Sequence, residues 1–419
     1  YPIFSIEKYY FCTMNFEYFV AKKLIKQKRK SFSKPIVSIA TAGIALSIAV
    51  MLISIGVLQG FKNQIKDKIT GFTSHIHLIP FAINSNNPTN NFTISEEEIN
   101  NLYKEENIKT INPYVLMGGA IKTKTDFHGV ALKGVETNYD SLFFKENLKA
   151  GRLPDYTNPK KKNEILISQT IADKLEIKIG DKIKIYFYID QNYRVRPFTV
   201  AGIYETGLGD YDNKFILCNA KVLQKLQSWQ ENQYSGYEVK LKDFTKLNQS
   251  AQNLYSLLPQ DKDLQTIEEM EPSLFAWLDL LDSNVILILI VMTLIAIITS
   301  CSTLLIMIFE QTKHIGILKS LGASTRSIIK IYLYKSLYIV GKAMIIGNGV
   351  AITLMYLQQN YKLIRLDQES YYLDSVPIEF SAFAILSVNL ACIIICMTSL
   401  IFPARNISKI SPMQNIKFE

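Results

Sequence analysis

Long apolar runs alternate with one long mixed segment along this chain. Residues 35–61 and 283–309 each contain 27 positions without a charged side chain. At 1.5 Å per residue, a helix of that length measures roughly 40 Å and crosses a hydrocarbon core about 30 Å thick with some tilt. A further uncharged run lies at residues 380–404, and another apolar run, at residues 328–361, is interrupted by Lys335 and Lys342. The pattern therefore predicts four membrane-spanning helices.

Basic side chains gather in three short segments, residues 1–34, 310–327 and 405–419. Residues 362–379 hold two basic and four acidic side chains instead. Lys and Arg resist translocation, so short basic segments stay in the cytoplasm. This distribution predicts cytoplasmic N- and C-termini and places the long segment 62–282 on the exterior side.

The exterior segment mixes helical and strand periodicities. Ser95 and Glu98 have capping-box spacing and predict the start of a helix. Residues 183–189 and 195–204 are rich in strand-forming side chains and flank a turn at 190–192. Short helices are expected at three further places, residues 171–175, 220–226 and 247–257. The exterior segment is therefore predicted to be an α+β domain.

Helical spacing resumes before the second span. Pro272 is favourable near a helix start, and the residues after it keep helical spacing up to the apolar run at 283. One continuous helix is expected to project from the membrane into the exterior domain, which would make a rigid connection.

Residues 16–34 precede the first span and combine apolar positions with a basic face. The apolar positions at helical spacing are Phe16, Phe19, Val20 and Leu24. This pattern is typical of a helix that lies on a membrane surface. A nucleic-acid-binding arm has a similar composition, but the adjacent span favours the membrane, and no nucleic-acid partner is expected. Residues 1–13, which precede Met14, are expected to be an upstream extension.

Composition limits the class of protein. The 419 residues are 48% hydrophobic and 20% charged, with a net charge of +9 and a mean hydropathy of +0.11. These values exclude a disordered chain, a disulfide-dense secreted scaffold and a collagen-like repeat. Of five cysteines only Cys218 lies in the exterior segment, so that segment holds no internal disulfide. Cys392 and Cys396 share a helix face, for which packing is the expected role.

Candidate catalytic and metal-binding residues are few. His75 and His77 lie on one side of a predicted strand without a third ligand at suitable spacing, so structural roles are expected. Asp210 and Asp212 lie in a glycine-rich loop with too few oxygen ligands for calcium, which favours a turn. The sequence contains no motif of a serine hydrolase or a zinc protease. We expect neither an enzyme nor a metal site.

Residues 310–327 contain a short amphipathic pattern after the second span. Ile315, Leu318 and Leu321 recur every three positions, and Gly322 follows them, which predicts a short helix that ends at the glycine. Periodicity alone leaves two interpretations open: a helix that lies on lipid, or a helix that docks on a soluble partner.

The segment Ile315–Ser324 resembles the pattern that follows the second span in FtsX-like ABC transporter permeases. Further similarities are at Ala21–Leu24, Gly60–Phe61, Gly151–Pro154, Ala172–Leu175, Gly180–Asp181, Pro403–Arg405 and Ile410–Pro412. Within that superfamily the chain is most similar to lipoprotein-releasing permeases of the LolC and LolE type. The resemblance implies a four-span, inner-membrane subunit that dimerises and carries a MacB-like periplasmic domain between its first two spans.

The resemblance also implies that residues 310–324 form a coupling helix that docks on a separate ATPase. The coupling residues would be Glu310, Lys313, His314, Ile315, Leu318, Lys319, Leu321 and Gly322. Because the sequence contains no Gly-x-x-x-x-Gly-Lys-Ser/Thr loop, we expect no cofactor in this chain, and ATP and Mg²⁺ in a LolD-like partner subunit. The other expected partners are a second permease subunit, identical or paralogous, a lipoprotein substrate and the membrane.

A substrate path between spans one and two is implied for a lipid-anchored cargo. Candidate wall residues are Met51, Ile55, Leu58, Leu287 and Ile290. Lys342 lies inside the third span, where a charge is costly unless it snorkels or pairs. The nearby glycines Gly341, Gly347 and Gly349 favour tight helix packing with a local partner for Lys342, and a direct substrate role is the alternative.

Departures from the family pattern keep other functions open. His314 stands where an acidic residue is usual, and this chain has a tight turn at Asp190–Asn192 where LolC has a longer hairpin that receives a carrier chaperone. MacB exporters carry a fused ATPase before the first span, for which residues 1–34 are too short, and division-linked FtsX proteins have a smaller outer domain. The alternatives are MacB-like export of a hydrophobic molecule or peptide, and FtsX-like control of a cell-wall hydrolase.

Overall fold

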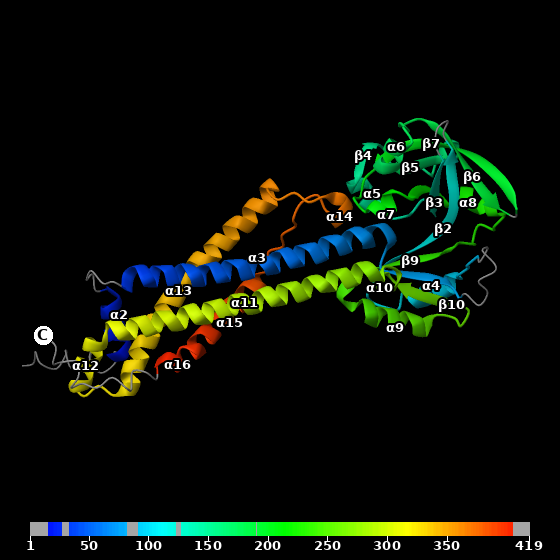
Figure 1. Ribbon diagram of the computed structural model, residues 1–419. Coiled ribbons are helices and arrows are strands. Elements are labelled where there is room, and N and C mark those ends of the chain that lie inside the picture. Colours follow the sequence, from blue (N-terminus) through cyan, green and yellow to red (C-terminus); the bar gives the residue numbers. More distant parts are fainter. Residues whose placement is uncertain (1–15, 27–32, 82–90, 123–126, 190, 405–419) are drawn as a thin grey trace, which may run out of the picture. The chain divides into compact units, whose positions relative to one another are not determined.

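The computed structural model describes residues 16–26, 33–81, 91–122, 127–189 and 191–404, and Figure 1 traces them in sequence order. The chain divides into two compact units. The membrane unit comprises Tyr1–Phe61, Asp279–Ile364 and Val376–Glu419, and the outer unit comprises Lys62–Leu278 and Arg365–Ser375. The expected extension at residues 1–13 and the basic tail at 405–419 lie outside the described residues.

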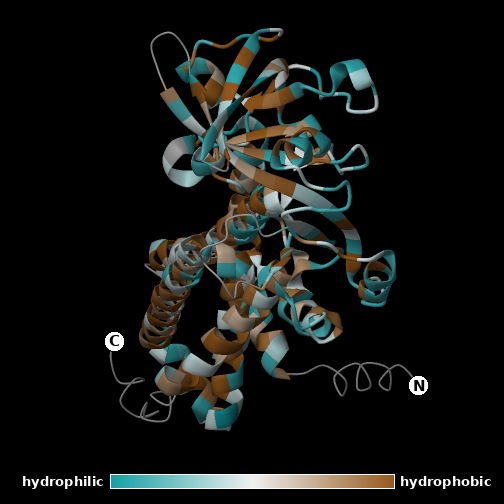
Figure 2. Cartoon of the chain, turned by 90° about the vertical axis from the view of Figure 1, so that its right-hand side faces the viewer, coloured by the Kyte–Doolittle hydropathy of each residue, from teal (hydrophilic) through white to brown (hydrophobic). Residues whose placement is uncertain are grey.

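Helices build the membrane unit. They are α2 (Phe16–Lys26), α3 (Ser33–Thr73), α11 (Pro272–Glu310), α12 (Thr312–Ser320), α13 (Thr325–Tyr361), α15 (Ala382–Ser399) and α16 (Ile401–Ala404). Among the described residues, four helical segments are long and apolar enough to cross a membrane: Pro35–Thr73, Pro272–Glu310, Thr325–Tyr361 and Ala382–Ala404. Figure 2 shows many apolar residues, in brown, on the helices of the membrane unit. The prediction of four spanning helices is confirmed.

Small residues bring the spanning helices close together. Gly347 of α13 packs on the backbone of α3, where an added Cβ would come 2.6 Å from the carbonyl oxygen of Ala45. Gly43 of α3 faces Thr299 of α11, whose Cγ2 would be 3.3 Å from such a Cβ. Around these contacts lies one apolar cluster from α3, α11, α13 and α15: Ile44, Ala45, Ile48, Ala49, Met51, Leu52, Ala296, Val340, Ala343, Ala351, Cys392 and Cys396. Small residues at helix interfaces are the usual basis of close packing in membranes.

Polar side chains connect α13 to α15 within the membrane unit. Asn348 and Asn389 exchange two amide hydrogen bonds, with N–O distances of 2.8 and 2.9 Å. Because unpaired amides are costly in an apolar environment, this pair fixes the register of the two helices.

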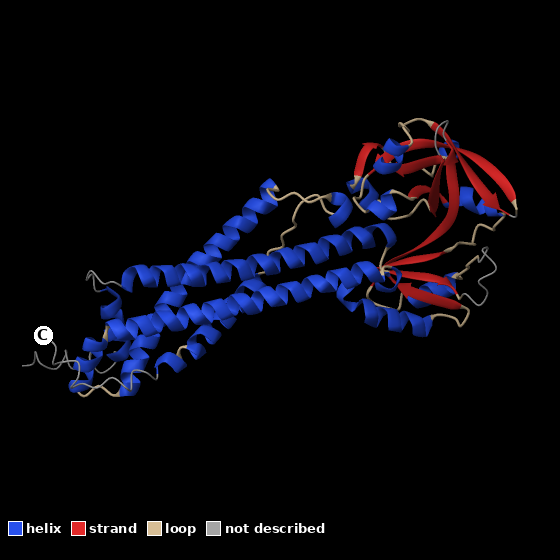
Figure 3. Cartoon of the chain, viewed as in Figure 1, coloured by secondary structure: helices blue, strands red, loops and turns tan. Residues whose placement is uncertain are grey.

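The outer unit is an α+β domain around one ten-stranded sheet, drawn in red in Figure 3. The strands are β1 (Ile76–Pro80), β2 (Ile108–Lys122), β3 (Phe127–Val135), β4 (Leu148–Gly151), β5 (Glu164–Ser168), β6 (Lys182–Ile189), β7 (Asn192–Tyr204), β8 (Phe215–Asn219), β9 (Gly236–Leu241) and β10 (Lys262–Thr266). Their order is β10-β1-β9-β2-β3-β8-β5-β7-β4, and β6 pairs with β2 and β7. Pairing is mostly antiparallel, with parallel pairs β3–β8 and β5–β7.

Short helices accompany the sheet. They are α4 (Glu96–Leu102), α5 (Leu142–Glu146), α6 (Gln169–Lys174), α7 (Gly209–Asp212), α8 (Ala220–Gln227), α9 (Leu247–Leu257), α10 (Ile267–Met270) and α14 (Gln368–Tyr371), with 3₁₀ turns η1 (Pro159–Lys161) and η2 (Phe244–Lys246). Ser95 and Glu98 form the predicted capping box of α4. The predicted hairpin is present as well, because Ile189 pairs with Asn192 across the β6–β7 turn.

Two long helices run from the membrane unit into the outer unit. Helix α11 begins at Pro272 and continues to Glu310, as the sequence predicts. Helix α3 continues to Thr73, well beyond the predicted span end at residue 61. The extension buries Ile65, Ile69 and Phe72 in the outer unit at helical spacing. A search for uncharged runs misses this extension because it contains Lys62, Lys66, Asp67 and Lys68.

Candidate coupling site

Helix α12 follows α11 after a single residue, Gln311, and Figure 1 shows α12 beside the ends of α11 and α13. Backbone hydrogen bonds continue across the break, from Gln311 N–H to the Met307 carbonyl at 3.2 Å and from Ile315 N–H to the Gln311 carbonyl at 3.0 Å. The Tyr332 hydroxyl of α13 donates to Oε1 of Gln311 at 3.1 Å. These contacts tie α12 to both long helices.

The inner face of α12 is apolar. Ile315 is fully buried, Gly316 is buried beside it, and Leu318 is half-buried. They pack on one cluster from α11, α13, α15 and α16, whose buried members include Leu304, Met307, Ile308, Ile328, Tyr332, Ile339, Leu400 and Ala404. Ile315, predicted as a coupling residue, therefore holds α12 on its own chain, and its side chain is not available to a partner in this structure.

A glycine ends α12 with a defined geometry. Gly322 has φ +90°, a value that side-chain-bearing residues rarely adopt. Its N–H donates to the Lys319 carbonyl at 3.0 Å, and the N–H of Ala323 donates to the Leu318 carbonyl at 2.9 Å. This pair of bonds is the Schellman motif, which satisfies the last carbonyls of the helix. Ser324 then caps α13 by accepting from the N–H of Ser327 at 3.2 Å.

We call residues 309–322 the coupling corner, and its outer face is exposed. Leu321 is 79% exposed, Phe309 69% and Ile317 52%. Glu310 and Lys313 are also exposed, whereas His314 and Lys319 are half-buried. Ile317 and Phe309 are missed by the sequence prediction because they fall outside the three-residue repeat of Ile315, Leu318 and Leu321. This mixed apolar and charged surface can receive a partner, whereas the face with Ile315 cannot.

Helix α2 supports the start of α13. The Ser327 hydroxyl donates to Oε1 of Glu17 at 2.9 Å, and the rings of Tyr18 and Tyr334 meet edge to face at 6.0 Å between centroids. Hydrogen bonds from its own backbone and from Ser327 lower the pKa of Glu17. The described helix ends at Lys26, so the remainder of the predicted amphipathic segment lies partly outside the described residues and partly in α3.

The predicted substrate-path residues differ in exposure. Leu287 and Ile290 of α11 are 62% and 53% exposed, and Ile55 and Leu58 of α3 are half-buried. Met51 is only 5% exposed and lines a partly open cavity of about 140 Å³ between α3, α11 and α15. Its role in the isolated chain is packing, because the Thr293 hydroxyl and the apolar cluster surround it.

Lys342 does not have the local partner that the sequence analysis favours. Its side chain is exposed on α13, and no hydrogen bond or ion pair joins it to any residue in the described part of the chain. The nearby Gly347 is used for packing against α3, whereas Gly341 and Gly349 face open space. The expected packing is thus present at Gly347 alone.

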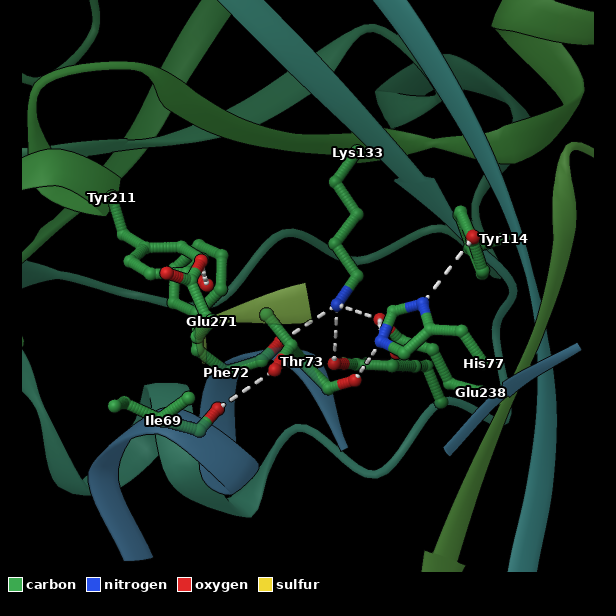
Figure 4. Close-up of polar contacts among 10 residues, drawn as sticks. Ile69, Phe72, Thr73, His77, Tyr114, Lys133, Tyr211, Glu238 and Glu271 are labelled. Atoms are coloured by element: carbon green, nitrogen blue, oxygen red, sulfur yellow. Dashed lines mark hydrogen bonds and ion pairs between the residues drawn. The ribbon is translucent and has the colours of Figure 1, made fainter. Parts of the chain in front are cut away.

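The outer end of α3 is held by a buried charge pair, shown in Figure 4. Lys133 Nζ lies 2.6 Å from Oε1 of Glu238, and both side chains are under 5% exposed. The same ammonium donates to the carbonyl of Phe72 at 2.7 Å, and His77 Nε2 contacts the carbonyl of Thr73. A cation at a helix C-terminus complements the helix dipole. Lys133 therefore binds the last turn of α3 to the sheet.

The residue that precedes α11 lines a cavity, which the Lys133–Glu238 pair lines as well. The Tyr211 hydroxyl donates to Oε1 of Glu271 at 2.6 Å, one residue before α11 begins. The cavity measures about 220 Å³, and Phe72, Tyr211, Lys133, Glu238 and Glu271 line it. Burial lowers the pKa of His77 and raises that of Tyr211, so both are neutral near pH 7. We call Lys133, Glu238, Phe72, Tyr211 and Glu271 the helix clasp.

The remaining candidate residues have structural roles in the described part of the chain. His75 Nδ1 accepts from the N–H of Leu241 at 2.7 Å. Asp212 accepts from the N–H groups of Thr206 and Gly207 and closes the glycine-rich turn. Cys392 and Cys396 lie 3.9 Å apart within the apolar cluster.

Comparisons with known proteins agree with this architecture. The family model for the MacB-like periplasmic core domain matches residues 37–256, and the model for the FtsX-like permease C-terminal region matches residues 286–412. The chain is 24% identical to the lipoprotein-releasing system transmembrane protein LolC of Buchnera aphidicola, with 93% of this chain and 95% of the relative covered. It is 22% identical to LolE of Haemophilus influenzae, with 96% and 99% covered.

Among solved structures, the periplasmic region of MacB from Actinobacillus actinomycetemcomitans matches 49% of this chain and 95% of that chain, at 13% identity and a TM-score of 0.34. The MacB-like match alone spans more than half of the sequence, and the FtsX-like match covers the second to fourth spans together with α12. The chain belongs to the family of FtsX-like permeases that carry a MacB-like periplasmic core domain.

Proposed function

We propose that this chain is the permease subunit of an ABC transporter that releases lipoproteins from the inner membrane. The observation that carries the proposal is similarity over more than nine-tenths of the chain to relatives named as lipoprotein-releasing transmembrane proteins. The geometry supports it, because α3 and α11 each run unbroken from an apolar span into a folded outer unit. Such helices are suited to carry movement rather than to perform chemistry.

ATP hydrolysis is assigned to a separate subunit that contacts the coupling corner. The exposed residues Phe309, Ile317 and Leu321 supply an apolar contact surface, and Glu310 and Lys313 supply charges around it. Because Ile315 and the Tyr332–Gln311 hydrogen bond fix α12 to α11 and α13, a displacement of α12 moves these helices. The second permease subunit, identical or paralogous, completes the transporter.

Movement of α11 and α3 reaches the outer unit through the helix clasp. Lys133 holds the last turn of α3, and Tyr211 holds the residue before α11. Lys133 and Tyr211 both belong to the outer unit. In this proposal a tilt of α3 or α11 is therefore passed to the outer unit and is not absorbed by a flexible loop. In this proposal the basic N- and C-terminal segments of the chain lie in the cytoplasm, and the outer unit lies in the periplasm.

The energetics of the cargo explain why such coupling is needed. Removing three acyl chains with about forty CH₂ groups from a bilayer into water would cost on the order of 30 kcal/mol at about 0.8 kcal/mol per CH₂. The chains therefore move from lipid to an apolar surface. Leu287 and Ile290 are exposed apolar residues on α11 that suit this contact, with Ile55 and Leu58 of α3 half-buried.

Depletion of the protein in cells tests the proposal. The expected result is accumulation of lipoproteins in the inner membrane, measured by membrane fractionation and immunoblotting. Sensitivity to hydrophobic drugs with normal lipoprotein sorting would instead indicate export, and unseparated cells with normal sorting would indicate control of a cell-wall hydrolase. Either result would contradict the proposal. Co-purification of the chain with an ATPase subunit tests the partner assignment separately.

A further inference from the structure

The charges of α13 set the depth of its residues in a membrane. After Lys342 the helix has no charged side chain up to its end at Tyr361, so its apolar stretch comprises residues 343–361. At 1.5 Å per residue this stretch measures roughly 28 Å, close to the thickness of a hydrocarbon core. Lys342 therefore lies at one edge of the core. Tyr338, one turn before it, lies at the level of the lipid headgroups, where tyrosines are enriched.

Helix α2 packs on one face of α13 just before this level. The Ser327 hydroxyl of α13 donates to Oε1 of Glu17 at 2.9 Å, and the rings of Tyr18 and Tyr334 meet edge to face. The same face of α13 continues at helical spacing through Tyr338, Lys342, Ile345 and Gly349. Helix α2 therefore covers one end of this face and leaves the part beyond Tyr334 open.

The open part of the face suits the acyl chains of a lipid. Tyr338 and Ile345 are 54% and 77% exposed. An added Cβ at Gly341 or at Gly349 would meet no atom within 4 Å. An acyl chain can therefore lie directly against the backbone of α13 at these two glycines.

The end of the face that α2 covers is positively charged. Lys22 and Lys23 of α2 and Lys342 of α13 are exposed, and Glu17 is the one acidic residue of α2. Lys22 Nζ lies 6.0 Å from the centre of the Tyr18 ring, which itself packs on α13. A lysine at the edge of the core extends its ammonium group towards the headgroups. Lys22 and Lys342 therefore approach the headgroup level from two helices, and basic side chains there attract anionic lipids.

We infer that this face of α13, with α2 at one end, binds an anionic phospholipid. The lipid phosphate pairs with Lys22 and Lys342, and the acyl chains lie along Tyr338, Ile345 and Gly349. This site is separate from the ATPase contact at α12. It belongs to the membrane unit alone and holds whether or not the transported cargo is a lipoprotein.

Quenching of a tryptophan by brominated lipids tests the inference. The full chain with Ile345→Trp is reconstituted in phosphatidylcholine vesicles that contain a minor fraction of brominated phosphatidylglycerol, or the same fraction of brominated phosphatidylcholine. Quenching in the parent chain, which contains Trp229 and Trp277, is subtracted. The ratio of quenching by the two brominated lipids removes the effect of depth, because both lipids carry bromine at the same place on the chain.

Phe402→Trp is the matched control reporter. Phe402 is 80% exposed and lies next to the end of its own span, as Ile345 does. The basic segment 405–419 follows it, so diffuse attraction of anionic lipid acts at this position too. The quenching ratio is expected to be several-fold higher at position 345 than at position 402.

Variants of the two lysines identify the headgroup contacts. Lys22→Met combined with Lys342→Met is expected to lower the ratio at position 345 to the value at position 402, whereas Arg at both positions retains it. Lys362→Met, at the opposite end of α13, is the matched control and is expected to leave the ratio unchanged.

A further variant keeps the test decisive if loss of both lysines alters folding. Gly349→Leu fills the open backbone position without meeting an atom of its own chain. It is expected to lower the ratio at position 345 while the unfolding temperature is retained. Equal ratios at positions 345 and 402 in the chain with both lysines would overturn the inference. A ratio that stays high in Lys22→Met/Lys342→Met would overturn it as well.

Discussion

Two lysines, one in each unit of this protein, differ in burial and in pairing. Lys133 in the outer unit is buried and paired with Glu238, and it also binds the last turn of α3. Lys342 in the membrane unit is exposed, without a partner among the described residues. The difference shows that a buried lysine of the outer unit is paired within its own chain, whereas the lysine of α13 keeps its charge on the surface of the membrane unit.

The largest effect is expected from breaking the buried pair. Lys133→Met leaves Glu238 buried without its counter-ion, and such a loss costs about 3–5 kcal/mol. The full chain in detergent is expected to unfold at a much lower denaturant concentration, measured by the fluorescence of its tryptophans. Lys149→Met is the matched control, because the Lys149–Glu205 pair is largely exposed and an exposed pair contributes under about 1 kcal/mol.

A double variant separates the effect of the missing counter-charge from the effect of lost side-chain packing. Lys133→Met combined with Glu238→Leu removes both charges, and apolar replacement of a buried pair is often close to neutral. Partial recovery of stability is therefore expected. Equal destabilisation by Lys133→Met and Lys149→Met would contradict the role given to the helix clasp.

A smaller effect is expected in the membrane unit, where glycines rather than charges fix the packing. Gly347→Leu forces a side chain against the Ala45 carbonyl, and overpacking costs about 1–3 kcal/mol. Thermal unfolding of the purified protein is expected to shift downward. Gly349→Leu is expected to leave the unfolding temperature unchanged, since that position is open. Equal shifts for the two variants would show that the two faces of α13 do not differ.

The coupling corner gives a third comparison, between two substitutions of Gly322. Gly322→Val places a β-branched residue at φ +90°, a strain of about 1–3 kcal/mol, whereas Asn tolerates this region. ATP-dependent release is expected to fall several-fold in Gly322→Val and to stay near normal in Gly322→Asn. Release that is unchanged in Gly322→Val would show that the end of α12 does not need this geometry.

The smallest effect is a dependence of outer-unit stability on pH. Burial, with help from the charges of Lys240 and Lys109, lowers the pKa of His75 from 6.5 to about 4. The folded state therefore binds fewer protons than the unfolded state between these values. The stabilisation is complete above about pH 6.5 and is lost progressively as pH falls towards 4.

Urea unfolding of the full chain between pH 7.5 and 4 measures this dependence. His75→Gln is expected to flatten the decline, and His128→Gln, at a residue whose Nε2 donates to the Asn213 carbonyl, serves as the control. If stability declines equally in His75→Gln, then groups other than His75 cause the dependence on pH.

Features determined by local sequence are predicted well. The four spans, the capping box at Ser95 and the end of α12 at Gly322 each follow from a few adjacent residues. The start of α11 at Pro272 is predicted for the same reason. Local patterns suffice where the physical cause is itself local.

Features that depend on contacts between distant residues are not predicted. Lys133 and Glu238 are more than one hundred positions apart, and nothing in either neighbourhood indicates that they pair. The inward direction of Ile315 is set by packing on α13 and α16, whereas its periodicity fits either face. The missing partner of Lys342 also needs the structure, because its glycine neighbours favour packing that only Gly347 makes.

The most direct test of the proposed coupling is lipoprotein release in proteoliposomes that contain the complete transporter. The double variant Ile317→Asp/Leu321→Asp alters only exposed residues of the coupling corner. The account predicts a normal unfolding temperature, and release in the presence of ATP that falls to the level seen without ATP. Release at the wild-type rate from this double variant would contradict the claim that the corner transmits the work of ATP hydrolysis.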